Sequence, residues 1–228
     1  MHAATFSRSG GVSAQPYNTL NLSYNSLDLK ESVDQNHYRI AQLFKGSLVT
    51  PNQVHGNKVL AIKNPNTALD CDGLITNEPG IALGIYHADC QAALFFDPKN
   101  QAIAAVHAGW RGLVAHIYQN TVSLLKETYG TNPVDLLVGI SPSLGPCHAE
   151  FTDFESFFPR KFTDYQVEKN HFDLWQISHD QLTAMGIKAQ NIDISHICTY
   201  CNRDEWFSYR RDKVTGRHLS FIQLRDCF

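Results

Sequence analysis

The sequence predicts an α+β fold in which a mixed β-sheet is sandwiched with helices. Residues 81–86, 91–96 and 102–107 are short apolar runs separated by turn residues, which is typical of strands buried on both faces. Segments with helical periodicity occur before and after these runs, and the strands and helices do not alternate strictly. Because the 228 residues contain no repeat or linker-like stretch, residues 1–228 are expected to form one domain.

The first third of the chain is expected to hold loops, one helix and short strands. Residues 7–26 are rich in Gly, Ser and Asn and predict a loop with a short strand around residues 20–22. A loose helical stripe follows over residues 31–44. Alternation over residues 47–63 predicts two short strands on either side of a turn at His55 and Gly56.

The second half is expected to add two helices, a strand and a hairpin. Residues 110–130 place apolar side chains on one helical face and end at Gly130, a glycine cap. Residues 134–140 predict a buried strand, and residues 172–186 another helix. The end of the chain, residues 206–224, predicts a hairpin that turns at residues 213–216.

Composition limits the classes of partner. The net charge is −3 and the 19 basic residues are scattered, which argues against a nucleic-acid surface. No apolar run approaches the length that spans a bilayer, and the N-terminus resembles neither a secretory signal nor a transit peptide, so a cytoplasmic protein is expected. Its six cysteines are then expected to be thiols, and the 11 histidines favour a search for a metal site.

Spacing around the second hairpin brings two reactive side chains together. The stretch DPKN, residues 97–100, has the composition of a type I turn between two apolar strands. With these four residues as the loop, Phe96 pairs with Gln101 and Cys90 falls opposite His107, with β-carbons about 5 Å apart. A loop of different length makes this pair diagonal, still within reach of a shared metal ion.

Three interpretations of Cys90 beside His107 remain open from spacing alone. The thiol packs beside a buried imidazole, or His107 holds Cys90 as a nucleophilic thiolate, or both bind a transition metal with a further ligand. His55, at a turn in QVHG, is the candidate for that further ligand.

Seven short motifs in order resemble the laccase-domain family, which is also called the polyphenol oxidase or peptidoglycan editing factor family. They are FSRSGGVS followed by YNTLNL, PNQVHG, DGLIT, ADC before an apolar strand, VHAGWRG, GISPSLGPC and SYRRDKVTGRHLSFI. The resemblance spans residues 6–224 and implies a zinc site at His55, Cys90 and His107. Two histidines and one thiolate leave one tetrahedral position open, as in a catalytic zinc site.

The resemblance also implies an activity: zinc-dependent phosphorolysis of purine nucleosides (adenosine, inosine, guanosine and methylthioadenosine) and deamination of adenosine. The expected partners are therefore purine nucleosides and phosphate. Asp89 is the candidate proton shuttle, although strand alternation points it away from Cys90 and a structural role is equally expected. Arg111, Arg210 and Arg8 are candidates for binding phosphate, and Asn21 for binding ribose or base. Gln53 and Tyr209 are possible neighbours of the site.

Copper oxidation of phenols and metal-free hydrolysis are the enzymatic alternatives. Copper can bind the same three residues, but no histidine has another two positions away, as a trinuclear copper cluster needs, and neither Met1 nor Met185 is near the ligands. In a cysteine amidohydrolase or a peptidoglycan editing enzyme, Cys90 would be the nucleophile and His107 the base. In a non-enzymatic interaction module, the zinc ion would hold the structure.

Three further residues stand out around these motifs. His87 precedes ADC where the family has a small residue or Thr, and His148 follows Cys147 where the family has a second Cys. Both are expected to line the pocket. The pair Cys198 and Cys201 forms a single CxxC, a weak metal signal without a second pair, so both are expected to be plain thiols.

Overall fold

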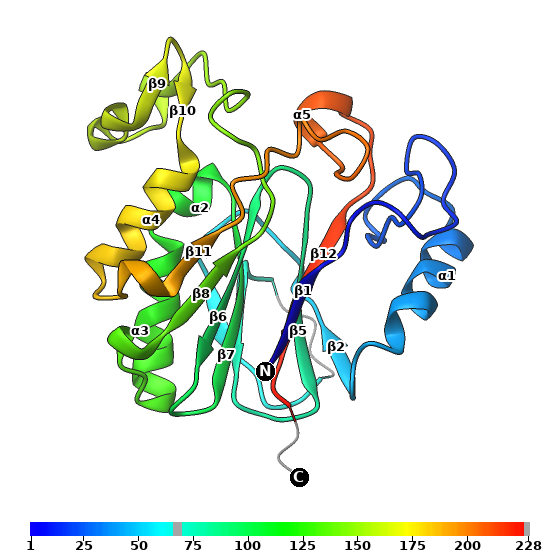
Figure 1. The fold of residues 1–228 in the computed structure, drawn as a ribbon, viewed down its shortest axis with the longest axis horizontal. Coiled ribbons are helices and arrows are strands. Elements are labelled where there is room, and N and C mark those ends of the chain that lie inside the picture. Colours follow the sequence, from blue (N-terminus) through cyan, green and yellow to red (C-terminus); the bar gives the residue numbers. More distant parts are fainter. Residues whose placement is uncertain (66–69, 226–228) are drawn as a thin grey trace.

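The computed structural model describes residues 1–65 and 70–225, which form two mixed sheets and flanking helices (Figure 1). The six-stranded sheet has the order β11-β8-β6-β7-β4-β3, and the four-stranded sheet has the order β1-β12-β5-β2. Their strands are β1 (His2–Thr5), β2 (Ser47–Val49), β3 (Val59–Ala61), β4 (Gly73–Thr76), β5 (Ile81–His87), β6 (Gln91–Asp97), β7 (Ala102–Ala108), β8 (Leu137–Ile140), β11 (Ile192–Ile194) and β12 (His218–Gln223). A separate pair, β9 (Gln166–Glu168) and β10 (His171–Phe172), forms a small hairpin.

Helices cover the outer faces of the two sheets. The α-helices are α1 (Lys30–Ala41), α2 (Trp110–Val114), α3 (Ile117–Tyr129), α4 (Leu174–Ala184) and α5 (Tyr209–Asp212). The 3₁₀ helices are η1 (Pro133–Asp135), η2 (Phe154–Ser156), η3 (Arg160–Tyr165) and η4 (Ala189–Asn191). Figure 1 shows α2, α3 and α4 on one side of the sheets and α1 on the other. Within the described residues, no helix is long and apolar enough to cross a membrane.

The central strand β7 shows how the sequence builds these layers. Its even-numbered side chains, such as Ala104 and Val106, pack toward α3 and α4, whereas Ile103 and Ala105 pack into the layer between the two sheets. Because successive side chains of a strand point to opposite faces, a strand in this position must be apolar throughout, and all of β7 is buried. The same explanation holds for β5 and β6.

The predicted fold class is confirmed, because mixed sheets lie between helices. The apolar runs at residues 81–86, 91–96 and 102–107 are the strands β5, β6 and β7. The helix expected over residues 110–130 is divided into α2 and α3 by His116, whose φ of 60° is left-handed. It ends at Gly130, with a φ of 72°, as expected for a glycine cap.

Two predicted elements are wrong. Residues 20–22 form no strand, and residues 206–224 form the short helix α5 followed by β12 rather than a hairpin. The hydroxyl of Ser208 accepts a hydrogen bond from the Arg211 amide and so begins α5. β12 pairs instead with β1 and β5, strands far away in the sequence, which local turn signals do not reveal.

The register of the β6–β7 hairpin also differs from the prediction. Asp97 pairs with Ala102, so the four-residue loop is residues 98–101 and His107 lies opposite Ala92. Asp97 is fully buried and its carboxylate accepts hydrogen bonds from the amides of Lys99 and Asn100, which places it in the strand rather than in the turn. Cys90 is therefore a diagonal neighbour of His107 on the same face, and not its direct partner.

Candidate active site

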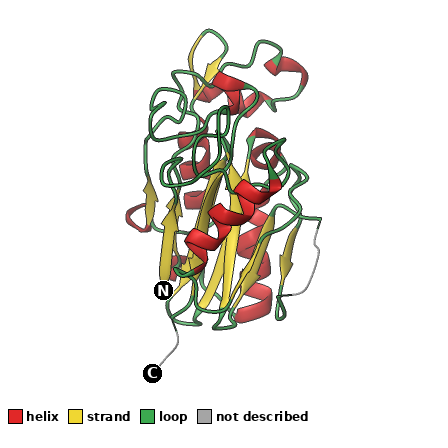
Figure 2. Cartoon of the chain, turned by 90° about the vertical axis from the view of Figure 1, so that its right-hand side faces the viewer, coloured by secondary structure: helices red, strands yellow, loops and turns green. Residues whose placement is uncertain are grey.

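Figure 2 shows loops gathered at one end of the strands. Three side chains of the kinds that bind metal ions, those of His55, Cys90 and His107, lie close together. His107 lies near the end of β7, Cys90 in the turn before β6, and His55 in the loop between β2 and β3. Their ligand atoms all lie within 4.8 Å of one another, and the two imidazole rings meet edge to face with centroids 4.8 Å apart. The diagonal register thus keeps Cys90 close to His107, and the loop between β2 and β3 brings His55 to them.

Asp72, directly before β4, holds two of these residues in place. Its carboxylate is fully buried and accepts a hydrogen bond of 2.8 Å from Nδ1 of His107. The same carboxylate accepts the backbone amides of His55 (2.9 Å) and Gly56 (2.6 Å), in a loop where His55 has a φ of 60°. Because Nδ1–H of His107 donates to Asp72, Nε2 of His107 is left to face Cys90 and His55.

Glycine leaves room for the chain beside the thiol. A β-carbon on Gly109 would lie 3.0 Å from Sγ of Cys90, and one on Gly112 would lie 3.3 Å from the carbonyl oxygen of Gly56. The small residues of VHAGWRG therefore allow the chain after β7 to pass close to both the thiol and the His55 loop.

The electrostatics of the cluster favour a charged thiolate. Burial opposes ionisation of Cys90, but the neighbouring His107 outweighs burial and lowers the pKa of the Cys90 thiol to about 6. Burial likewise disfavours the imidazolium of His107, but Cys90 and Asp72 together raise its pKa to about 9. A deprotonated thiol is the form that binds a metal ion.

The cluster lies where two cavities meet. One cavity, of about 610 Å³, has apolar walls that include Trp110, Phe151 and Leu174. The other, of about 980 Å³, is lined by polar and aromatic groups such as Tyr24 and Arg217. His55, Cys90, Arg111 and Tyr209 belong to the walls of both. A ligand in either cavity would therefore reach His55 and Cys90, and one in the larger cavity would also reach His107.

The arginines named from the sequence divide between these cavities and another part of the surface. Arg111 is exposed in both cavities and lies over the Trp110 ring, 4.4 Å from its centroid. Arg210 lines the smaller cavity and donates to the carbonyl oxygen of Glu150. Arg8 lies in a different hollow, where it donates to the carbonyl oxygens of Asn18 and Arg203.

Asp89 borders the smaller cavity, but its carboxylate already has partners in the chain. Oδ1 accepts the Thr199 hydroxyl at 2.7 Å and Oδ2 accepts the Arg210 amide at 2.5 Å. With a φ of 90°, Asp89 also makes the tight turn between β5 and β6. These contacts favour the positioning role that was one of its two expected roles.

Asn21 has no side-chain group left for a ligand. It is fully buried, its amide donates to Ser26 and Asp28, and its Oδ1 accepts the backbone amides of Ser23 and Arg217. The structure thus gives Asn21 a part in holding the loop that carries Arg217.

Three of the remaining residues line the larger cavity. The side-chain amide of Gln53 donates a hydrogen bond to the Tyr86 carbonyl oxygen and accepts one from the Tyr86 backbone amide, so the His55 loop is attached to β5. His87 is 2% exposed, shares a hydrogen bond with Ser220, and burial lowers its pKa to about 3. Tyr209 borders both cavities.

Asp72 and Arg217 were missed as site residues, although both stand in recognised motifs, DGLIT and TGRHLSFI.

Comparison with known proteins decides the family. The family model of multi-copper polyphenol oxidoreductase laccases matches residues 2–225. The chain belongs to this family. The laccase-family assignment made from the seven motifs is therefore confirmed.

Proteins similar to this chain include named enzymes. A purine nucleoside phosphorylase of Bacteroides thetaiotaomicron is 33% identical over 240 residues, which cover 95% of this chain and 89% of the relative. Purine nucleoside phosphorylase YfiH of Escherichia coli is 34% identical over 233 residues, covering 97% and 93%. The crystal structure of YlmD from Geobacillus stearothermophilus matches with a TM-score of 0.90 at 29% identity, covering 98% of this chain and 92% of that chain.

Proposed function

We propose that this chain is a zinc-dependent purine nucleoside phosphorylase that acts on adenosine, inosine, guanosine and methylthioadenosine. The observation that carries the proposal is the position of His55, Cys90 and His107 at the junction of two cavities, with arginines in the walls of both. The names of the relatives from Bacteroides thetaiotaomicron and Escherichia coli support the same activity.

The three donors fit a zinc ion. Zinc takes imidazole nitrogen and thiolate sulfur, and three protein ligands leave a fourth position for a small molecule. His55, Cys90 and His107 would hold the ion, and Asp72 would orient His107 from behind, as carboxylates commonly do beside zinc-binding histidines. When bound, the ion would supply a Lewis acid and lower the pKa of water in the open position.

Phosphate is expected to bind in the larger cavity. Arg111 and Arg217 both line it, and a guanidinium suits the paired oxygens of a phosphate. The smaller cavity, with Trp110, Phe151 and Leu174, suits the flat apolar faces of a purine. Phosphorolysis needs the two substrates close together, and both cavities share the Cys90 wall.

Deamination of adenosine is the second activity that we propose for the site. It needs a carboxylate to move protons between water and the purine. The contacts of Asp89 with Thr199 and Arg210 give it a positioning role, but the carboxylate also borders the smaller cavity and keeps acceptor positions for a third partner, so we propose it for this proton transfer as well. Release of inosine from adenosine without phosphate would support this activity.

Product separation tests the proposal directly. Protein purified without chelator is incubated with adenosine or inosine, with and without phosphate. We expect free base and ribose phosphate only when phosphate is present, loss of that activity after chelation, and recovery with zinc. A chelated protein that keeps full activity would contradict a metal-dependent reaction and favour the cysteine hydrolase. Phenol oxidation that depends on added copper would favour the oxidase alternative instead.

Replacement of Arg217 by alanine should weaken phosphate binding. Hydrogen bonds to charged groups contribute about 1.5–3 kcal/mol, so the KM for phosphate is expected to rise about tenfold to a hundredfold. The KM for inosine should change less, because the purine is expected in the other cavity. Initial rates at varied phosphate check this, with Arg160→Ala, a change at an exposed arginine outside both cavities, as the matched control. Equal effects of the two substitutions would remove Arg217 from the phosphate site.

A further inference from the structure

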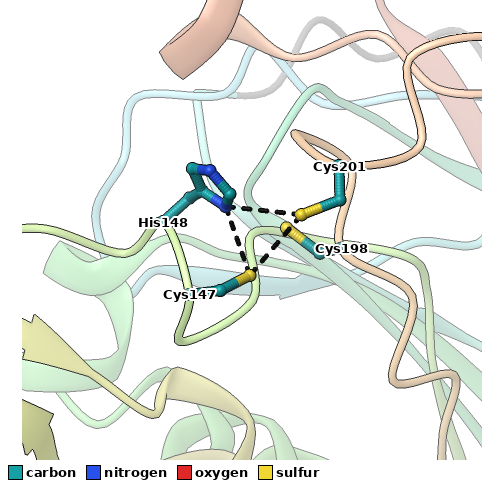
Figure 3. Close-up of side chains that lie close together, drawn as sticks. All are labelled: Cys147, His148, Cys198 and Cys201. Carbon is teal, nitrogen blue, oxygen red and sulfur yellow. Dashed lines mark hydrogen bonds between the residues drawn. The ribbon is translucent and has the colours of Figure 1, made fainter.

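We propose that Cys147, His148, Cys198 and Cys201 form a second zinc site, structural in kind, beside the active-site wall. Figure 3 shows the four side chains converging from two separate loops. Cys147 and His148 follow β8, and Cys198 and Cys201 follow β11. All four ligand atoms lie within 4.8 Å of one another, so the CxxC that stood alone in the sequence has a second pair of donors in space.

The distances match the edges of a tetrahedral zinc site. With Zn–S bonds of about 2.3 Å and Zn–N bonds of about 2.0–2.1 Å, two sulfurs lie about 3.8 Å apart and a sulfur and a nitrogen about 3.5 Å apart. Here Sγ of Cys147 and Sγ of Cys201 are 3.7 Å apart, and Nδ1 of His148 lies 3.2 Å and 3.4 Å from these two sulfurs. The widest pair is within 4.8 Å, so closure around an ion needs shifts of about 1 Å.

The surroundings hold these donors in position. The His148 ring stacks on Tyr200, with centroids 3.8 Å apart, and this contact holds the plane of the ring, whose Nδ1 lies beside the sulfurs of Cys147 and Cys201. The Gly145 amide donates to Sγ of Cys198, and ligands held by such hydrogen bonds are common in metal sites. Gly145 is needed there, because a β-carbon would meet the Trp175 ring at 2.8 Å.

Four protein donors distinguish this site from the one at Cys90. Three sulfurs and one imidazole fill the tetrahedral positions, which is the pattern of structural zinc sites. A disulfide between Cys147 and Cys201 explains fewer of these contacts. Its two sulfurs would have to approach to about 2.05 Å, and His148 would have no part in it.

A zinc ion at this site would hold together the two loops that support the wall of the smaller cavity. The two loops already run side by side, with the Thr199 amide bonded to the Ser143 carbonyl oxygen. Thr199, between the two CxxC cysteines, donates to Asp89, and Arg210 donates to the His148 carbonyl oxygen. A zinc ion at the four donors would therefore fix residues that hold Asp89 and Arg210, while taking no part in the chemistry.

Zinc content tests the proposal without any assay of activity. We expect two zinc ions per wild-type chain, one in Cys201→Ser, one in Cys90→Ser and none in the double variant. Cys71→Ala, which removes a buried thiol outside both clusters, should keep two. Cobalt gives a second readout, since sulfur-to-cobalt absorption grows with the number of thiolates. It should be about threefold stronger in Cys90→Ser than in Cys201→Ser.

Cys201 and Cys147 are exposed, so Cys201→Ser is expected to fold, and His148→Ala provides an independent variant that should also lose one zinc. Circular dichroism checks that both variants are folded. One zinc per wild-type chain, unchanged by Cys201→Ser and by His148→Ala, would overturn the proposal. So would a peptide joined through Cys147 and Cys201 in the freshly purified, unreduced protein, because it would assign the pair to a disulfide.

Discussion

Replacement of Cys90 by serine is expected to abolish metal binding at the active site and nearly all phosphorolysis. The serine hydroxyl stays protonated at neutral pH and is a poor substitute for a thiolate ligand. A bound metal ion stabilises a transition state by several kcal/mol, and each 1.4 kcal/mol is a factor of ten, so kcat/KM should fall about a thousandfold. Steady-state kinetics with inosine and phosphate, together with zinc analysis, measure both effects.

Two comparisons separate this result from a general loss of structure. Cys71→Ala removes a fully buried thiol elsewhere in the core and should keep both the active-site zinc and the activity. The far-UV circular dichroism of Cys90→Ser should match that of Cys71→Ala, since Cys90 lies at a cavity wall and its replacement leaves the folded core in place. If Cys90→Ser lost activity while its two imidazoles still bound a full equivalent of zinc tightly, Cys90 would act as a nucleophile and not as a ligand.

The sequence predicted the three donors because each follows from a local pattern. The apolar runs of β6 and β7 and the short turn between them place Cys90 and His107 on one face even with the register shifted. The residue opposite His107 is Ala92 instead of Cys90, a shift of two positions, and a shift of two keeps the same face. His55 came from the resemblance and from the turn at Gly56. These features are local in the chain, which is why they could be recognised without coordinates.

The parts that escaped prediction depend on contacts between distant segments. Asp72 acts through His107 and the His55 loop, on two other elements, and its own neighbours in sequence show only a DG turn. β12 was assigned to a hairpin because its true partners are far away in the sequence: β5 by more than 130 residues, as in His218 with His87, and β1 by more than 210, as in Ser220 with Thr5. The second pair of donors for Cys198 and Cys201 was hidden for the same reason.

Substitution of Asp72 by asparagine is expected to damage both stability and the active site. One carboxylate oxygen accepts hydrogen bonds from Nδ1 of His107 and from the His55 backbone amide. The other accepts hydrogen bonds from the backbone amides of Gly56 and Val54. An asparagine amide offers one carbonyl oxygen and one NH₂ group, so in either orientation one pair of donors faces another donor. Each buried donor left without a partner costs about 1–3 kcal/mol, which urea unfolding can measure.

Activity should fall by a second route, distinct from the stability loss. Without the carboxylate, His107 loses its fixed tautomer and the His55 loop loses its anchor, so zinc affinity and kcat/KM are each expected to drop about tenfold to a hundredfold. Asp70→Asn is the matched control: Asp70 is exposed, two positions away, and bonded to the Asn52 side chain at 2.6 Å. Zinc titration and kinetics at a temperature where both variants are folded separate the two routes. An Asp72→Asn protein with wild-type zinc affinity would show that the three ligands are held by the strands alone.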